Sequence, residues 1–282
     1  MLSYYKPTNL EEATQLKAQV PDSVFLGGGT VLNSLGWSKY VEEGRVQDYA
    51  ALIDVTGLEL GTVEEQDGYI RLAANIPVQD IYVHPLCPAM LRANLKQMDN
   101  LNIRNMATLG GSLGVNSPCS NSLAALLCVH AEVEVYTASG LKRIALEEYA
   151  QNKQDSDLVV AFYVPKAWVK LPCATRRYSR SQSDISIVLA DVIMQQQDGK
   201  VCQISAVAGG VASHVVRLKA LEKALSGQEL PSAEQVAKLV AEDIAPVSDI
   251  RGGAEFKALL IGELTDWCLH NVAVQPCCDC KH

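Results

Sequence analysis

Residues 103–118 read IRNMATLGGSLGVNSP, the most unusual stretch of the chain. The segment is too rich in Gly, Asn and Ser for an ordinary core element, yet apolar residues punctuate it and would hold it against one. Glycine lets a backbone approach a ligand closely and point successive N–H groups at one anion. We therefore expect a glycine-rich binding loop over residues 105–116, with a pair of ordinary tight turns as the alternative.

A second glycine cluster, LGGGTVL at residues 26–32, follows an apolar run and precedes an apolar turn. This order predicts a strand, a loop and a helix, and a helix N-terminus favours phosphate. The sequence contains no G-x-G-x-x-G and no G-x-x-x-x-G-K-[ST], so it lacks both the Rossmann fingerprint and the Walker A loop. Two such loops, each beside a strand, favour one shared diphosphate ligand.

The surrounding pattern predicts two α+β domains. Thr8 is expected to cap a first helix, and Asp67-Gly68 and Asp198-Gly199 each join two strand-like runs as hairpins. Helical spacing covers residues 216–225, 233–241 and 254–270, and residues 166–172 resemble a linker. We therefore expect a larger domain over 1–168 and a smaller sheet-and-helix domain over 172–272.

The composition excludes several classes of protein. Of the 282 residues 48% are hydrophobic and 20% are charged, which is typical of a folded chain, and the net charge of −8 argues against nucleic acid or an anionic membrane surface as a partner. No stretch approaches the ~20 apolar residues of a membrane span, and the N-terminus does not resemble a signal peptide. We expect a cytoplasmic protein.

The nine cysteines do not form a recognisable metal-binding or disulfide pattern. The first six are scattered through apolar segments and are expected to be small core residues. The tail over 273–282 contains Cys277, Cys278, Cys280 and His282, but their spacing fits a tetrahedral site poorly, so a disordered cysteine-rich tail is preferred over a metal site. The scattered histidines suggest no catalytic grouping, and we assign neither a metal nor a catalytic residue.

The two loops resemble those of a known family. Residues 27–32 match an [AG]-G-G-T-x-L pattern, and residues 103–118 match I-R-N-x-A-T-[IL]-G-G-[NS]-[ILV]-x-x-x-S-P; the likeness continues at residues 179–182, 208–212 and 249–256. Both patterns are similar to those of the FAD-binding flavoprotein, or medium, subunit of molybdenum hydroxylases of the xanthine dehydrogenase and carbon monoxide dehydrogenase type. The resemblance covers nearly the whole chain.

This resemblance implies an α+β fold and a set of cofactor contacts. The fold would be a two-subdomain FAD-binding domain, similar to that of vanillyl-alcohol oxidase (PCMH-like), followed by a small domain of the carbon monoxide dehydrogenase flavoprotein type. The implied FAD contacts in the loops are Leu26, Gly27, Gly28, Gly29, Thr30, Val31 and Leu32, then Ile103, Thr108, Leu109, Gly110, Gly111, Ser112 and Asn116.

Four further implied contacts include three departures from the family pattern. Asn121 stands where the family usually has an acidic residue that contacts an FAD hydroxyl, and an amide can still accept or donate such a bond. Met98 replaces a frequent aromatic residue and Arg176 a frequent lysine; a core methionine and a solvated arginine are the equally weighted alternatives. Val159 would offer its backbone. The basic run over 176–180 would be either a charged strand edge or a surface near the flavin or a partner.

The resemblance also implies a function within a complex. Electrons would reach FAD on this chain from a [2Fe–2S] small subunit, which receives them from a molybdopterin-binding large subunit, and would leave to NAD⁺ or another acceptor. The chain itself has no cysteine pattern for a [2Fe–2S] cluster. A cofactor-poor scaffold subunit and a stand-alone FAD-dependent NAD(P)H reductase are the alternatives.

Overall fold

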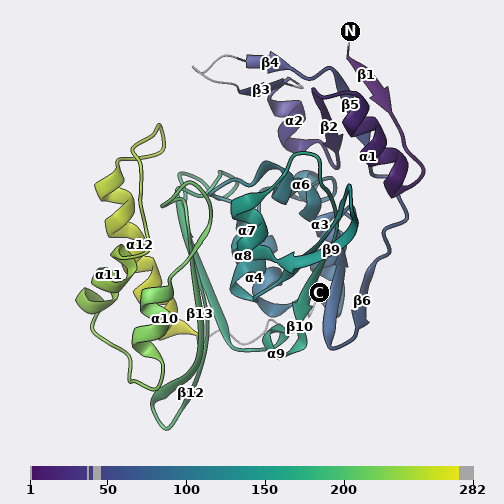
Figure 1. The fold of residues 1–282 in the computed structure, drawn as a ribbon. Helices are drawn as coiled ribbons and strands as arrows, with labels where there is room; N and C mark the ends of the chain where they lie inside the picture. The colour runs from purple at the N-terminus through teal and green to yellow at the C-terminus, as the bar shows by residue number, and fades with distance from the viewer. Residues whose placement is uncertain (1, 37, 41–45, 273–282) are drawn as a thin grey trace.

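The computed structural model describes residues 2–36, 38–40 and 46–272, and it opens with a small parallel sheet. The strand order is β1 (Ser3–Tyr5), β5 (Ala51–Asp54) and β2 (Ser23–Leu26). Helices α1 (Leu10–Gln19) and α2 (Thr30–Ser34) and the hairpin of β3 (Ser38–Tyr40) and β4 (Val46–Asp48) lie beside this sheet (Figure 1). The predicted strand, loop and helix around residues 24–32 are therefore present.

The first helix begins one residue later than expected. Asn9, not Thr8, is the N-cap, and its side chain accepts from the backbone N–H of Glu12 at 2.9 Å. The carboxylate of Glu12 accepts in turn from the backbone N–H of Thr8 at 2.7 Å. Asparagine and threonine are both good capping residues, so adjacent candidates left the sequence prediction uncertain by one position.

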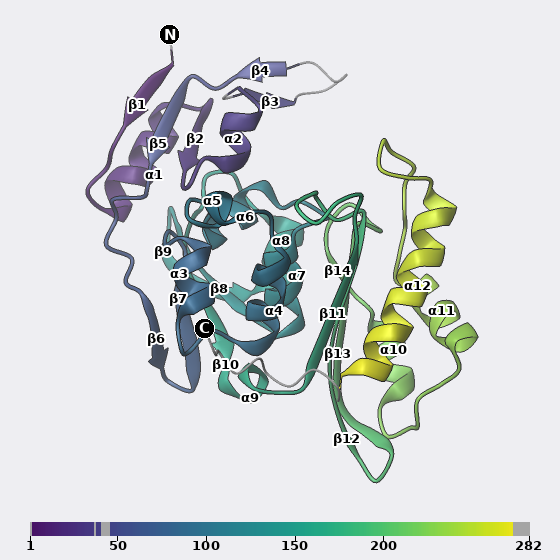
Figure 2. The same ribbon diagram turned by 180° about the vertical axis from the view of Figure 1, so that it is seen from behind.

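A five-stranded antiparallel sheet forms the centre of the first domain. Its order is β6 (Val63–Gln66), β7 (Tyr69–Ala73), β10 (Leu158–Pro165), β8 (Glu132–Thr137) and β9 (Gly140–Ala145). The predicted hairpin at Asp67-Gly68 is confirmed, with φ of 47° and 83° in the turn. Packed against one face are α3 (Val78–Val83), α4 (Ala89–Gln97), α5 (Leu101–Arg104), α6 (Leu109–Val115), α7 (Asn121–Cys128) and α8 (Leu146–Asn152) (Figure 2).

The second domain is a four-stranded antiparallel sheet with helices on its outer face. The strands lie in the order β11 (Cys173–Tyr178), β12 (Val188–Gln197), β13 (Lys200–Gly209) and β14 (Val216–Arg217). Helices α10 (Lys219–Leu225), α11 (Ala233–Ala241) and α12 (Ala254–Asn271) cover the side away from the first domain (Figure 1). Residues 216–217, expected to be helical, instead pair with Val207 and Ala208 of β13.

The sheet of the second domain is buried on both faces. Leu189 and Ile193 of β12 belong to the same apolar cluster as the first domain's helices, whereas Ala190 and Val192 belong to the cluster under α12. This alternation follows from the period of two along a strand. The two domains therefore share one of the apolar clusters.

Smaller details correct the sequence predictions. Residues 166–169, expected to be linker, form the short helix α9 (Lys166–Val169). Five of the six described cysteines are buried, as predicted, but Cys202 on β13 is exposed. The tail over 273–282, with Cys277, Cys278 and Cys280, lies outside the described residues. No helix of the described segments is long and apolar enough to cross a membrane.

Candidate functional site

The two glycine clusters lie directly against each other. A Cβ atom on Gly28 would stand 1.7 Å from the carbonyl oxygen of Met106, and one on Gly27 would stand 2.7 Å from Oγ1 of Thr108. Neither position has room for a side chain, because real Cβ contacts do not reach such distances. The structure therefore brings together the two segments that the sequence predicted to share a ligand.

The first cluster presents free backbone donors. Gly29 has φ of 67°, in the left-handed region that favours glycine, and it is the N-cap of α2. Within the described part of the chain, the backbone N–H groups of Gly27, Gly28 and Gly29 donate to no hydrogen-bond acceptor. Successive unpaired N–H groups of this kind form an anion-binding concavity. The residues present therefore fit a phosphate-bearing cofactor.

The second cluster is a capped helix rather than the loop expected over 105–116. Thr108 is the N-cap of α6, and its Oγ1 accepts from the backbone N–H of Gly111 at 3.0 Å. Leu109 and Leu113 are fully buried, whereas Gly111 and Gly114 are exposed. The threonine cap and the two leucines favour a helix. The glycines place no side chain on its exposed side, so a ligand can come close to the backbone there.

Exposed apolar side chains lie on both clusters. Met106 is 57% exposed and Val115 45% exposed, and Val31 on α2 is also exposed. Concave ligand sites combine such apolar surface with a few polar groups that fix orientation. A ligand with a diphosphate and flat aromatic rings matches this combination.

Asn121 does not lie on this bare surface. It is the first residue of α7 and only 8% exposed, and its amide contacts Asn94 of α4 at 3.5 Å and Ser186 at 3.3 Å. The contact lies where the first domain meets the second. Met98, which follows α4, and Ile103 on α5 are half-buried against the large core cluster.

Two other predicted contacts have structural partners of their own. Asn116 ends α6 with φ of 50°, and its Nδ2 donates to the carbonyl oxygen of Ala150 at 2.8 Å. Val159 is half-buried on β10, at a bulge in its pairing with β8. Whether either one also touches the cofactor stays a prediction.

The structure does not bring Arg176 to the glycine clusters. Its guanidinium lies 4.3 Å from the ring centre of Trp267 on α12, on the face of the sheet away from the first domain. The neighbouring Arg177 takes the opposite face, because side chains alternate along a strand. Burial lowers the pKa of Arg177, while Asp184 and Asp99 oppose that shift. The sequence analysis included Arg177 in the basic run over 176–180 but singled out only Arg176 as a cofactor contact, although this alternation was the available signal to separate the two.

Arg177 also fixes the connection between β11 and β12. Its guanidinium donates to the carbonyl oxygen of Asp184 at 2.7 Å and to that of Gln182. The connection leads directly to Ser186, which contacts Asn121. Arg177 therefore supports the segment that meets the first domain beside the predicted cofactor residues.

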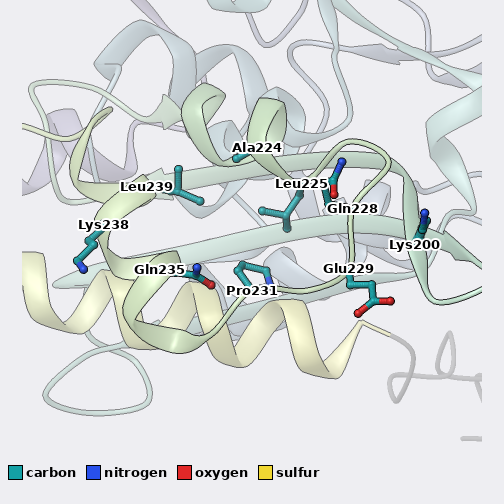
Figure 3. A pocket seen from close by; sticks show the side chains of 9 residues that line it. All are labelled: Lys200, Ala224, Leu225, Gln228, Glu229, Pro231, Gln235, Lys238 and Leu239. Carbon is teal, nitrogen blue, oxygen red and sulfur yellow. The ribbon is translucent and has the colours of Figure 1, made fainter.

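A separate cavity of about 670 Å³ lies in the second domain (Figure 3). Leu225 and Leu239 form part of its apolar lining, and Lys200 and Lys238 part of its polar lining. Lys238 is already paired with Glu234 at 2.8 Å. No residue of either glycine cluster lines the cavity, so it is distinct from the candidate cofactor site.

Comparisons with known proteins agree with this geometry. The profile of the FAD binding domain in molybdopterin dehydrogenase matches residues 1–167, and that of the CO dehydrogenase flavoprotein C-terminal domain matches residues 174–272. The chain is 30% identical to the protein YgfM of Escherichia coli (strain K12), covering 93% of this chain and 92% of that one. It is 24% identical to the nicotine 6-hydroxylase medium subunit of Paenarthrobacter nicotinovorans, covering 93% and 94%.

Solved structures show the same fold. A carbon monoxide dehydrogenase of Hydrogenophaga pseudoflava superimposes with a TM-score of 0.87 at 22% identity, covering 97% of each chain. Quinoline 2-oxidoreductase of Pseudomonas putida 86 gives a TM-score of 0.85 at 20% identity, again covering 97% of each chain. The fold and the paired clusters thus define an FAD-binding flavoprotein. The chain belongs to the family of FAD-binding subunits of molybdenum hydroxylases of the xanthine dehydrogenase and carbon monoxide dehydrogenase type.

Proposed function

We propose that this chain is the electron-transfer subunit of its complex, taking electrons from an iron–sulfur subunit and passing them to NAD⁺ or another acceptor. FAD supplies the redox chemistry when bound, and the protein binds and orients it. The observation that carries the proposal is the contact between Gly28 and Met106, which joins the free N–H groups of the first cluster to the bare side of α6.

The chain's own residues would bind the cofactor without a basic patch. The N–H groups of Gly27, Gly28 and Gly29 and the hydroxyl of Thr30 would hold the diphosphate from one side. The N-terminal turn of α6, from Leu109 to Ser112, would approach it from the other side. Hydrogen bonds of neutral donors to a charged phosphate suit a protein whose net charge is −8.

A molybdopterin-binding large subunit and a [2Fe–2S] small subunit are the proposed partners. The proposal is supported by the printed names of relatives, which include a nicotine 6-hydroxylase medium subunit and a carbon monoxide dehydrogenase medium chain. In this arrangement the large subunit determines the substrate, and the isolated chain performs only the flavin half-reaction. The cytoplasmic location stays a prediction.

The visible spectrum of the purified chain tests the proposal. A flavin spectrum with one FAD released per chain, and reduction by a reduced iron–sulfur partner, would support it. A colourless chain that takes up no added FAD would favour a scaffold subunit instead. Rapid NAD(P)H oxidation by the isolated chain with an artificial acceptor would indicate a stand-alone reductase.

A further inference from the structure

Four buried polar side chains form a hydrogen-bonded chain across the contact between the two domains. Asp191 of β12, Asn94 of α4 and Ser186 are 0% exposed, and Asn121 of α7 is 8% exposed. Asn94 Nδ2 donates to Asp191 Oδ1 at 3.0 Å, and Asn121 Nδ2 donates to Asn94 Oδ1 at 3.5 Å. The hydroxyl of Ser186 donates to Asn121 Oδ1 at 3.3 Å. Every bond therefore points from Ser186 toward Asp191.

This direction fits an ionised Asp191. An ionised carboxylate only accepts, so Asn94 must turn its amide N–H toward it. A protonated carboxyl can instead donate its O–H to Asn94 Oδ1. Asn94 would then donate to Asn121, and Asn121 would donate to Ser186. In that state the hydrogen bonds of the same four side chains would run in the opposite direction. Asn94 would then lose the bonds that its Nδ2 also donates to the carbonyl oxygen and the sulfur of Met90, both at 3.3 Å.

The surroundings of Asp191 allow both charge states near neutral pH. Burial raises the pKa of Asp191 to about 7, and the neighbouring Thr175 and Asn94 oppose this only in part. Its Oδ2 has no hydrogen-bond partner among the described residues.

No cation offsets this burial within the described part of the chain. The titratable groups whose pKa values Asp191 shifts are thiols, and the charged Glu222 and Arg176 also act on them. Cys128 of α7 and Cys268 of α12 are both buried, and the pKa of each is raised by burial and by Asp191. Cys173 of β11 shares the face of the sheet that carries Asp191. Cys128 and Cys268, whose pKa values are raised, stay neutral near pH 7, whereas Asp191 changes charge there.

We propose that Asn94 and Asp191 are positioning residues for Asn121, and that a proton on Asp191 sets which end of the Asn121 amide faces Ser186 and which faces Asn94. The inference rests on the proposed function and on the contact with an FAD hydroxyl that the family resemblance implies for Asn121, a residue that is only 8% exposed. The amide then presents either its oxygen or its N–H to the cofactor, depending on the direction of the chain. The second domain thereby acts on the FAD site of the first.

Side-chain amide NMR of the full-length chain without FAD tests the positioning directly. Between about pH 5.5 and about pH 8.5 we expect the Asn94 and Asn121 amide resonances to shift with one midpoint, shared with the Asp191 carboxyl carbon. Asp191→Asn should abolish the shift. Asp198→Asn is the matched control, because it makes the same change in an exposed Asp-Gly turn and should preserve the shift.

FAD affinity over the same pH range tests the link to the cofactor. The dissociation constant of the wild-type chain should change on the order of 3- to 10-fold with that midpoint, as expected for one hydrogen bond gained or lost. Asp191→Asn and Asn94→Leu should bind FAD with little pH dependence, whereas Asp198→Asn should behave as the wild type does.

The outcomes separate the inference from the proposed function. Wild-type amide resonances that ignore the titration of Asp191 would overturn the positioning role, and this readout needs no variant that could fail to fold. If the Asn94 and Asn121 amide resonances follow the titration of Asp191 but the chain binds no FAD, the positioning role stands and the proposed function is contradicted. Coupled resonances with a pH-independent FAD affinity would overturn the link between Asp191 and the cofactor.

Discussion

At position 28 the side chain can be no more than a hydrogen atom, because the Met106 carbonyl occupies the place of a Cβ. We expect Gly28→Val to separate the two clusters, to leave the chain without bound FAD and to cost about 1 to 3 kcal/mol of stability. Flavin content and urea unfolding measure the two effects. Gly253→Ala is the control, since a Cβ there meets nothing closer than 4.0 Å; a Gly28→Val chain with full flavin content would contradict the site.

Asp191 makes stability depend on pH. Its folded pKa of about 7 lies above the unfolded value of 3.8, so the folded state binds more protons between these two values. Stability should therefore fall as pH rises from about 4 to about 7, by at most roughly 4 kcal/mol from this group. Asp191→Asn should be more stable than the wild type at pH 8 and similar at pH 4, as measured by urea unfolding. If the free energies of unfolding of the two chains change with pH in parallel, the raised pKa of Asp191 is contradicted.

Among the elements, α6 depends on its first cap. We expect Thr108→Ala to cost about 1 kcal/mol of stability and to weaken FAD binding, because the cap holds Gly111 and Oγ1 borders Gly27. Thr108→Ser keeps the capping hydroxyl and should retain the stability and the FAD affinity of the wild type. Ser232→Ala removes a comparable cap on α11, far along the chain, and should lower stability without changing the FAD dissociation constant measured by fluorescence. Equal FAD affinities in the two alanine variants would exclude a special role for Thr108.

Strand alternation on β11 separates two neighbouring arginines. Arg176→Ala should remove a cation–π contact with Trp267, worth about 0.5 to 1 kcal/mol, and leave FAD binding unchanged. Arg177→Ala should weaken FAD binding, because the connection to Ser186 loses two hydrogen bonds. Titration with FAD measures the dissociation constant of each variant. A larger loss of FAD affinity in Arg176→Ala than in Arg177→Ala would show that Arg176 reaches the cofactor.

The sequence predicted elements whose signals are local, and it failed where the deciding contact is distant. Turn chemistry identified the hairpins at Asp67-Gly68 and Asp198-Gly199. Glycine content suggested a loop over 105–116, but burial of Leu109 and Leu113 selects a helix. Residues 216–217 pair with β13, a partner that helical spacing does not reveal. In the site, the sequence motifs predicted both glycine clusters. The contacts of Arg177 and the buried partners of Asn121 could not be predicted, because they depend on how the two domains pack.

At the scale of the whole molecule, the shared core predicts one unfolding transition. Leu189 is fully buried within the cluster that joins the two domains. We expect Leu189→Ala to cost about 2 to 5 kcal/mol and to lower the melting temperature recorded by flavin release and by circular dichroism equally. Cys202→Ser, on the exposed part of β13, should leave both melting temperatures unchanged. Two separate transitions would show that the domains unfold independently.

The contact between Gly28 and Met106 also determines when the cofactor can bind during synthesis. The first cluster leaves the ribosome early and carries its N–H groups, but α6 and the core that supports it are made much later. Because that core includes Leu189 and Val207 of the second domain, the binding surface is complete only when most of the chain has been translated. We therefore expect FAD to bind late in synthesis, and a chain truncated before β12 to bind no FAD.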